Sequence, residues 1–266
     1  MRGAPHAHIL LWLVEDGKKE EKQIVFNGHI KTIEVPKPAP CFRNSVFGKS
    51  GEERIQGKKE LLEFIESIVS IENNRLATRN IHGHSFTCQK GKKKVIKIQP
   101  NEGHGKFKPN GENNLLIVPK CRFGFPRFPM PDSRILEPMN PLETSEEELK
   151  IAAKNFKKIQ KFIIRQTFTY RKEETNEARK RFFELSFEKF LWHLDLSELE
   201  YCQALQSQIT GRAKLFLKRD TSQIFINNYN INIMETHDAN MDISIGECSS
   251  IIYHVFTNSR PATLPR

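Results

Sequence analysis

The order of apolar and polar positions predicts both strands and helices. The six consecutive apolar residues from Ile9 to Val14 are typical of a short buried strand and are too few to cross a membrane. Residues 16 to 22 are charged and predict a loop. Ile24 to Val35 predicts a short strand pair around Asn27-Gly28, a standard signal for a hairpin turn. The prolines between Pro36 and Pro40 then predict a stiff spacer.

Several later segments show helical spacing. Glu60 to Ile71 fits an amphipathic helix. Ser145 and Glu148 form a capping box that begins another helix, which extends to about Gln166. The expected inner stripe of this helix is Leu149, Ala152, Ala153, Phe156, Ile159 and Ile163, and its outer face is Lys150, Lys154, Lys157, Lys158 and Lys161.

The next helix is expected from Asn176 to Leu194, with an aromatic stripe turned inward. This stripe of Phe183, Phe187, Phe190 and Leu191 is more typical of core packing than of a base-stacking platform. A shorter helix follows Ser197, with Glu200 at the capping-box position.

The remaining strand-like segments complete the predicted architecture. Residues 213–219, 223–227 and 239–243 are strand-like. We expect an α+β fold in which an antiparallel sheet contains the strand from His6 to Val14 and the one from Ala239 to Ile243. Helices between residues 60 and 208 are expected to form an insertion packed to one side of that sheet.

Composition points to a polyanionic partner in a reducing compartment. The chain has 266 residues, a net charge of +10 and 38% hydrophobic residues, a globular composition with an excess of cations. This balance favours nucleic acid over a membrane surface. The five cysteines are odd in number and widely spread, unlike a secreted disulfide framework. No signal peptide precedes the first motif, so we expect an intracellular, nuclear protein with no membrane partner.

Two sets of lysines are candidate DNA contacts. Lys92, Lys93, Lys94 and Lys97 lie in a basic segment of residues 90–114 that is rich in Gly and Asn and is expected to be a mobile loop. Phosphate contact and simple solvation are both consistent with this loop. Lys154, Lys158 and Lys161 form the second set, on the predicted outer helix face.

His6 and His8 are the first candidates for a metal site. Residues i and i+2 project from the same face of a strand, so the two imidazoles can bind one divalent ion that polarises a phosphate oxygen. The alternative is a pair of surface histidines. Asp242 shares a strand face with Asp238 and Asn240, and it is either a third ligand or part of a solvent face.

A second candidate metal site combines His82, His84, Cys88 and Cys121. Two histidines and two cysteines are the ligand set of a closed tetrahedral zinc site. The gap of 32 residues between the cysteines is long for a zinc finger. The alternative is two ordinary thiols near two loop histidines.

Several of these motifs together resemble the Helitron transposon proteins. The resemblance rests on Arg2-Gly3-x-Pro5-His6-x-His8 before an apolar strand, the His82-x-His84-x-x-x-Cys88 and Cys121-Arg-Phe-Gly-Phe-Pro126 segments, Ile135 to Pro138, the Asn228-Tyr229-Asn230 loop and Asn240-x-Asp242. Helitron proteins are paired-histidine (HUH) rolling-circle replication initiators, usually joined to a helicase. The resemblance implies Mg or Mn at the paired histidines, a tyrosine nucleophile and a single-stranded DNA substrate.

The chain also departs from the family pattern. Tyr253 is the nearest tyrosine to the expected nucleophile position but is two residues away from it, and no lysine follows it. Gly48-Lys49-Ser50 lacks the glycine of a phosphate-binding loop, because Arg43 stands there, and no helicase motif is visible. We expect an incomplete Helitron helicase-like region over residues 1–250, truncated at both ends, with a zinc-binding subregion at 80–130 and an unrelated tail at 251–266.

These features predict a DNA-binding protein without strand-transfer activity. The alternative is an active metal-dependent nickase that uses His6, His8 and Tyr253.

Overall fold

The computed structural model describes residues 13–26, 29–72, 75, 77–84, 88, 93–97, 115–119, 121–140, 142–167, 179–237 and 242–243. These residues form an α+β fold, as predicted. The chain divides into two compact units, one of Met1–Ile68 with Ser244–Arg266 and the other of Val69–Ile243. Within the described ranges, no helix has the length and apolar character needed to cross a membrane.

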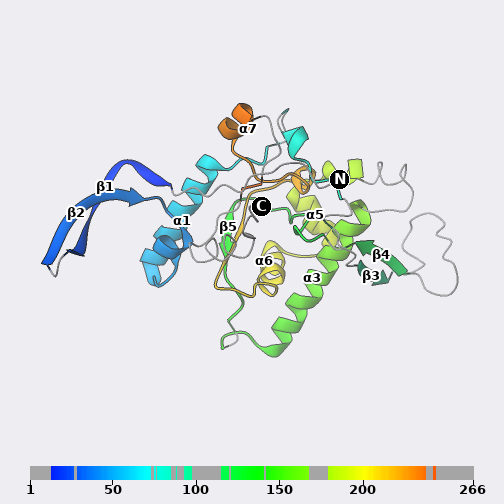
Figure 1. The fold of residues 1–266 in the computed structure, drawn as a ribbon. Helices are drawn as coiled ribbons and strands as arrows, with labels where there is room; N and C mark the ends of the chain where they lie inside the picture. Colours follow the sequence, from blue (N-terminus) through cyan, green and yellow to red (C-terminus); the bar gives the residue numbers. More distant parts are fainter. Residues whose placement is uncertain are drawn as a thin grey trace, which may run out of the picture. The chain divides into compact units, whose positions relative to one another are not determined.

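The first unit begins with a long antiparallel ladder (Figure 1). Strand β1 (Val14–Phe26) pairs with β2 (His29–Pro38), and Phe26 pairs with His29, as the predicted two-residue turn requires. The prediction of a loop at residues 16–22 is wrong, because this segment belongs to β1. A two-stranded ladder leaves charged side chains in solvent, and Lys19 Nζ pairs with Glu34 across the strands at 3.0 Å.

Helix α1 (Gly51–Ile68) follows a short π-helical turn, η1 (Phe42–Val46). The helix begins earlier than the predicted Glu60, because its polar first half also packs through a glycine. Gly57, Leu61 and Ile65 are buried at four-residue spacing. A Cβ on Gly57 would lie 1.8 Å from the carbonyl oxygen of Ser45, so only glycine permits this approach.

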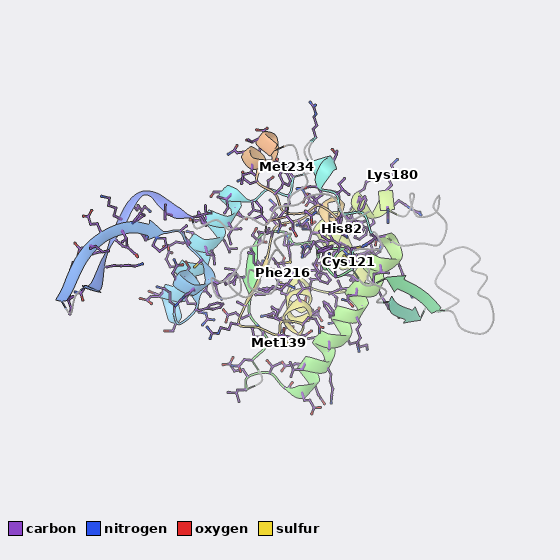
Figure 2. All side chains as sticks on the ribbon, in the orientation of Figure 1. His82, Cys121, Met139, Lys180, Phe216 and Met234 are labelled. Carbon is purple, nitrogen blue, oxygen red and sulfur yellow. The ribbon has the colours of Figure 1, made fainter. Side chains whose placement is uncertain are left out.

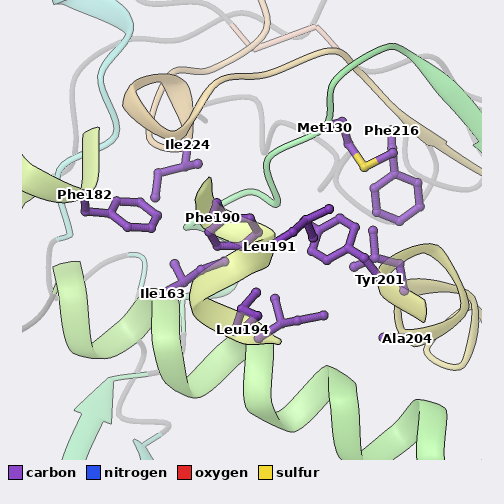
Figure 3. Close-up of a cluster of buried hydrophobic side chains, with 12 residues drawn as sticks. Met130, Ile163, Phe182, Phe190, Leu191, Leu194, Tyr201, Ala204, Phe216 and Ile224 are labelled. Carbon is purple, nitrogen blue, oxygen red and sulfur yellow. The ribbon is translucent and has the colours of Figure 1, made fainter. Parts of the chain in front are cut away.

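The core of the second unit lies between three helices, α3 (Glu146–Thr167), α5 (Phe187–Leu194) and α6 (Glu198–Gln206). The expected capping boxes are confirmed, since the Ser145 and Ser197 amides donate to the carboxylates of Glu148 and Glu200 at 2.7 and 2.8 Å. The fully buried members of the core are Met130, Ile159, Ile163, Phe182, Phe190, Leu194, Tyr201, Ala204, Leu205 and Ile224, most of which are labelled in Figure 3.

The expected continuous helix from Asn176 to Leu194 is wrong. The helix ends at Phe183, and Ser186 begins α5 by accepting a hydrogen bond from the Lys189 amide at 3.3 Å. A local side-chain cap here replaces helix continuation. Of the predicted stripe, Phe190 and Leu191 are buried in the core, and Phe183 and Phe187 are partly buried and pack against it. Phe182, which was not part of the predicted stripe, is fully buried, and its ring centroid lies 6.2 Å from that of Phe190.

The strands of the second unit form small ladders. Strand β3 (Lys93–Lys97) pairs with β4 (Leu115–Pro119), so part of the expected basic loop is strand. Strand β5 (Arg134–Leu136) pairs with β6 (Lys214–Phe216), and β6 covers part of the predicted strand at 213–219.

The chain ends its second unit with α7 (Ile231–His237) and the described residues Asp242 and Ile243. These two residues are not in a strand, unlike the prediction for 239–243. Instead, the backbone amide of Ile243 donates to the Asn228 carbonyl at 3.0 Å, and the side-chain amide of Asn228 donates to the Ile243 carbonyl at 3.1 Å. Asn228 therefore joins the segment after Ile226 to the described residues Asp242 and Ile243.

Candidate metal centre

Two distant parts of the chain supply the four predicted ligands. His82 and His84 follow an isolated bridge between Ile81 and Ile226, and the His82 amide donates to the Phe225 carbonyl at 2.7 Å. Cys121 follows β4, 39 residues after His82. The Arg122 amide donates to the Cys88 carbonyl at 2.9 Å, which joins the two cysteine segments by a backbone hydrogen bond.

The ligand atoms of His82, His84, Cys88 and Cys121 all lie within 4.8 Å of one another. Figure 2 shows His82 and Cys121 close together, and their Nε2 and Sγ atoms are 3.3 Å apart. The corresponding distance from His84 Nδ1 to Cys88 Sγ is 3.6 Å. Bonds of about 2.0–2.1 Å to nitrogen and 2.3 Å to sulfur at a tetrahedral angle place N and S about 3.6 Å apart. The four side chains can therefore hold a metal ion, with ligands as the sequence predicted.

The protonation of the histidines also suits metal binding. Burial, together with the nearby His84 and Arg127, lowers the pKa of His82 to about 4. Burial, together with Arg179, lowers the pKa of His84 as well. Both imidazoles are thus neutral at neutral pH, the form that donates a lone pair to a metal.

Aromatic side chains that the sequence analysis did not single out pack against the ligands. The Phe125 ring stacks on His82 with centroids 4.3 Å apart and an interplanar angle of 12°. The Phe225 and His84 rings lie nearly perpendicular to each other, with centroids 5.9 Å apart. Cys88 and Cys121 are only 1% and 8% exposed and pack with Phe125 in one apolar cluster. An apolar shell of this kind keeps water away from ligands and fixes ring orientation.

The predicted metal ligands His6 and His8 and the predicted nucleophile Tyr253 lie outside the described residues. Asp242 is described and is an exposed residue. Partial desolvation raises the pKa of its carboxyl, whereas Arg127 and Arg219 lower it. The charged groups that act on Asp242 are therefore guanidinium groups.

Arg219 is a buried residue that the sequence did not reveal. Its side chain is 4% exposed and donates to the carbonyl oxygens of Gln223 and Ile226 and to Asn228 Oδ1. Burial lowers its pKa, as does Arg127. An arginine inside a predicted strand gives no sequence signal for this role, because its three acceptors are brought together only by the fold.

The predicted DNA-contacting lysines fall into two groups. Lys154, Lys158 and Lys161 are exposed on α3, as expected. Lys93, Lys94 and Lys97 lie on β3 with side chains outside the described part, and Lys92 is also outside it.

Comparison with protein-family models, with curated proteins and with solved structures found no match to this chain. Its function is therefore inferred from its own residues and their arrangement.

Proposed function

We propose that the chain is a Helitron-derived protein that binds single-stranded DNA, is stabilised by zinc and does not transfer strands. It would be related to rolling-circle replication initiators. The observation that carries DNA binding is the lysine face of α3.

The lysine face comprises Lys150, Lys154, Lys157, Lys158 and Lys161, all of which are exposed. Their spacing places them along one side of the helix over about 16 Å, at about 1.5 Å per residue. The acidic residues of α3 are confined to its first turn, Glu146 to Glu148, and none follows as far as Thr167. Lys150 is paired with Glu146 at 2.6 Å, so the phosphate-binding part begins at Lys154. Such a row neutralises consecutive phosphates without reading sequence.

Zinc is the metal that best fits the four-ligand centre. Two imidazoles and two thiolates form a typical structural zinc set, whereas Mg and Ca prefer oxygen ligands. All four ligands come from the protein, and both cysteines are buried. A closed centre of this kind leaves no open position for substrate, so its role is to stabilise the fold.

The proposal of binding without strand transfer has two supports. A divalent cation at Asp242 would have to compete with the charges of Arg127 and Arg219, which act on the same carboxylate. Tyr253 is also displaced from the position at which the family resemblance places its nucleophile. Nucleophilic attack on phosphate requires accurate placement, since an error near 1 Å can cost about 100-fold in rate.

The test of DNA binding is a titration of a labelled single-stranded oligonucleotide at several salt concentrations. Affinity is expected to fall steeply with salt. Replacing Lys154, Lys158 and Lys161 together by Gln removes up to three phosphate contacts, which lowers the salt slope by up to about 2, at about 0.7 per contact. The matched control replaces Lys49, Lys58 and Lys59 of the first unit and leaves the slope unchanged. Absence of binding by the wild-type protein at low salt would refute the proposal.

A covalent-capture assay separates this proposal from the alternative nickase. The protein is incubated with labelled oligonucleotide and Mn²⁺ or Mg²⁺, and denaturation-resistant adducts are sought. We expect none. An adduct that disappears in Tyr253→Phe and in His6→Ala would establish the nickase that uses His6, His8 and Tyr253.

A further inference from the structure

We propose that Arg122 and Phe123, at the tip of the turn next to the metal centre, form a stacking contact for a base of single-stranded DNA. This inference rests on the proposed DNA-binding function and locates one contact that the lysine face does not provide.

The turn spans Cys121 to Gly124 and presents its two central residues outward. The Gly124 amide donates to the Cys121 carbonyl at 3.3 Å, which closes the turn with Arg122 and Phe123 at its centre. Gly124 has a φ of 75°, a conformation that favours glycine, and it reverses the chain before the buried Phe125. The sequence Phe-Gly-Phe thus sends one ring to solvent and the other into the apolar cluster.

The exposed ring is already paired with a cation. Phe123 is 42% exposed, and the guanidinium carbon of Arg122 lies 4.4 Å from its ring centroid. The Phe123 and His82 rings are nearly perpendicular, with centroids 5.8 Å apart, and this contact holds the Phe123 ring against the metal centre. Exposed aromatic rings and guanidinium planes are the surfaces on which unpaired bases stack.

The charge around the turn favours a polyanion over an apolar protein partner. The guanidinium group of Arg127 lies over Phe125 at 4.6 Å. Burial lowers the pKa of Lys214, and the charge of Arg127 lowers it as well, so these two cations are close enough to repel each other. An exposed Phe covered by a guanidinium group fits a base with its flanking phosphates, whereas a protein-binding site needs a larger apolar patch.

The turn is fixed by the same residues that hold the metal. Cys121 is both its first residue and a ligand, and the Arg122 amide is bonded to the carbonyl of Cys88, a second ligand. Zinc would therefore order the platform before DNA arrives, which lowers the entropic cost of binding. Removing the metal is expected to weaken the stacking contact as well as the fold.

The experiment measures binding of a thymidine 15-mer by Phe123→Ala, Phe123→Leu and Phe123→Trp at fixed salt. Loss of the ring in the Ala and Leu variants is expected to weaken binding by roughly 5- to 150-fold, which corresponds to about 1–3 kcal/mol per stacked base. The Trp variant keeps its affinity, and its added fluorescence is quenched by DNA. An abasic 15-mer of equal charge is insensitive to all three changes. Trp192→Ala is the matched control, because Trp192 is 77% exposed on α5 and its loss leaves affinity unchanged.

Zinc content and melting temperature are measured for each variant, so that a folding defect is not mistaken for lost stacking. Unchanged thymidine binding by well-folded Phe123→Ala would overturn the inference while leaving the DNA-binding proposal intact. Equal losses on the thymidine and abasic oligonucleotides would also overturn it. A wild-type protein that binds no oligonucleotide would refute the proposed function itself.

Discussion

Replacement of Cys121 by Ser is expected to abolish zinc binding and to remove the stabilisation that zinc gives to the unit of Val69–Ile243. Cys121 Sγ lies 3.3 Å from His82 Nε2, slightly inside the separation of about 3.6 Å that a tetrahedral zinc requires. This pair of ligand atoms thus needs to separate by only a few tenths of an ångström to accept the ion. Serine keeps the size of the side chain but removes the thiolate, one of the four bonds.

The size of the effect follows from linkage between binding and folding. Structural zinc sites bind with about 10–16 kcal/mol, and the weak end of that range corresponds to a Kd of about 5 × 10⁻⁸ M. Free zinc at about 10 µM then exceeds the Kd roughly 200-fold and stabilises the native state by about 3 kcal/mol. For a unit of this size, about 2–4 °C per kcal/mol gives a rise in Tm of roughly 6–12 °C.

The assay is thermal unfolding under reducing conditions, with and without zinc, combined with metal analysis. Wild-type protein is expected to bind about one zinc per chain and to melt higher with zinc, whereas Cys121→Ser shows neither effect. Cys202→Ser is the matched control, because Cys202 is a buried thiol of the same unit and is not one of the four candidate metal ligands. Its Sγ atom accepts a hydrogen bond from Arg134 at 3.5 Å. A wild-type protein that melts at the same temperature with and without zinc, and retains no metal, would refute the reasoning.

Three further predictions concern stability and are measured by urea unfolding. Gly57→Ala is expected to lower the free energy of unfolding by about 1–3 kcal/mol, because its Cβ would lie 1.8 Å from a backbone oxygen. Gly211→Ala is the control, since a Cβ there has nothing within 4 Å and changes stability by less than about 0.5 kcal/mol. Arg219→Met is expected to cost on the order of 3 kcal/mol, since three oxygen acceptors lose their donor. Tyr201→Phe is expected to cost about 1 kcal/mol through loss of its hydroxyl bond of 2.8 Å to the Pro129 carbonyl.

Each stability prediction has an outcome that contradicts it. Equal effects of Gly57→Ala and Gly211→Ala would show that α1 moves away from η1 without cost. An Arg219→Met variant of unchanged stability would mean that water replaces the guanidinium group. A Tyr201→Phe variant of unchanged stability would mean that water replaces the hydroxyl group at the Pro129 carbonyl.

Features that depend on a few neighbouring residues could be predicted from the sequence. Ser145 with Glu148 and Ser197 with Glu200 predicted two helix starts, because a capping box satisfies backbone donors within one turn. The apolar stripe of α3 and the two-residue turn between β1 and β2 were predicted for the same reason. The outer lysines of α3 followed directly, since the face opposite a buried stripe is exposed.

Local pattern failed where a competing interaction decided the outcome. The second half of the charged segment from Asp16 to Lys22 is held in strand conformation because Lys19 to Lys22 pair with β2. The aromatic helix ends before Ser186 because a side-chain cap replaced the next helical hydrogen bonds. In both places the residue types alone fitted two conformations.

The convergence of the four candidate ligands and the orientation of the Cys121–Gly124 turn depended on the tertiary structure. The sequence supplied two histidines and two cysteines, but their convergence depends on a contact between His82 and Cys121 across 39 residues. It also gave no sign that Phe125 would face the ligands while Phe123 faces solvent. The sequence specifies which chemical groups are present, but distances between remote side chains depend on how the whole unit packs. The burial that keeps His82 neutral likewise exists only in the packed unit.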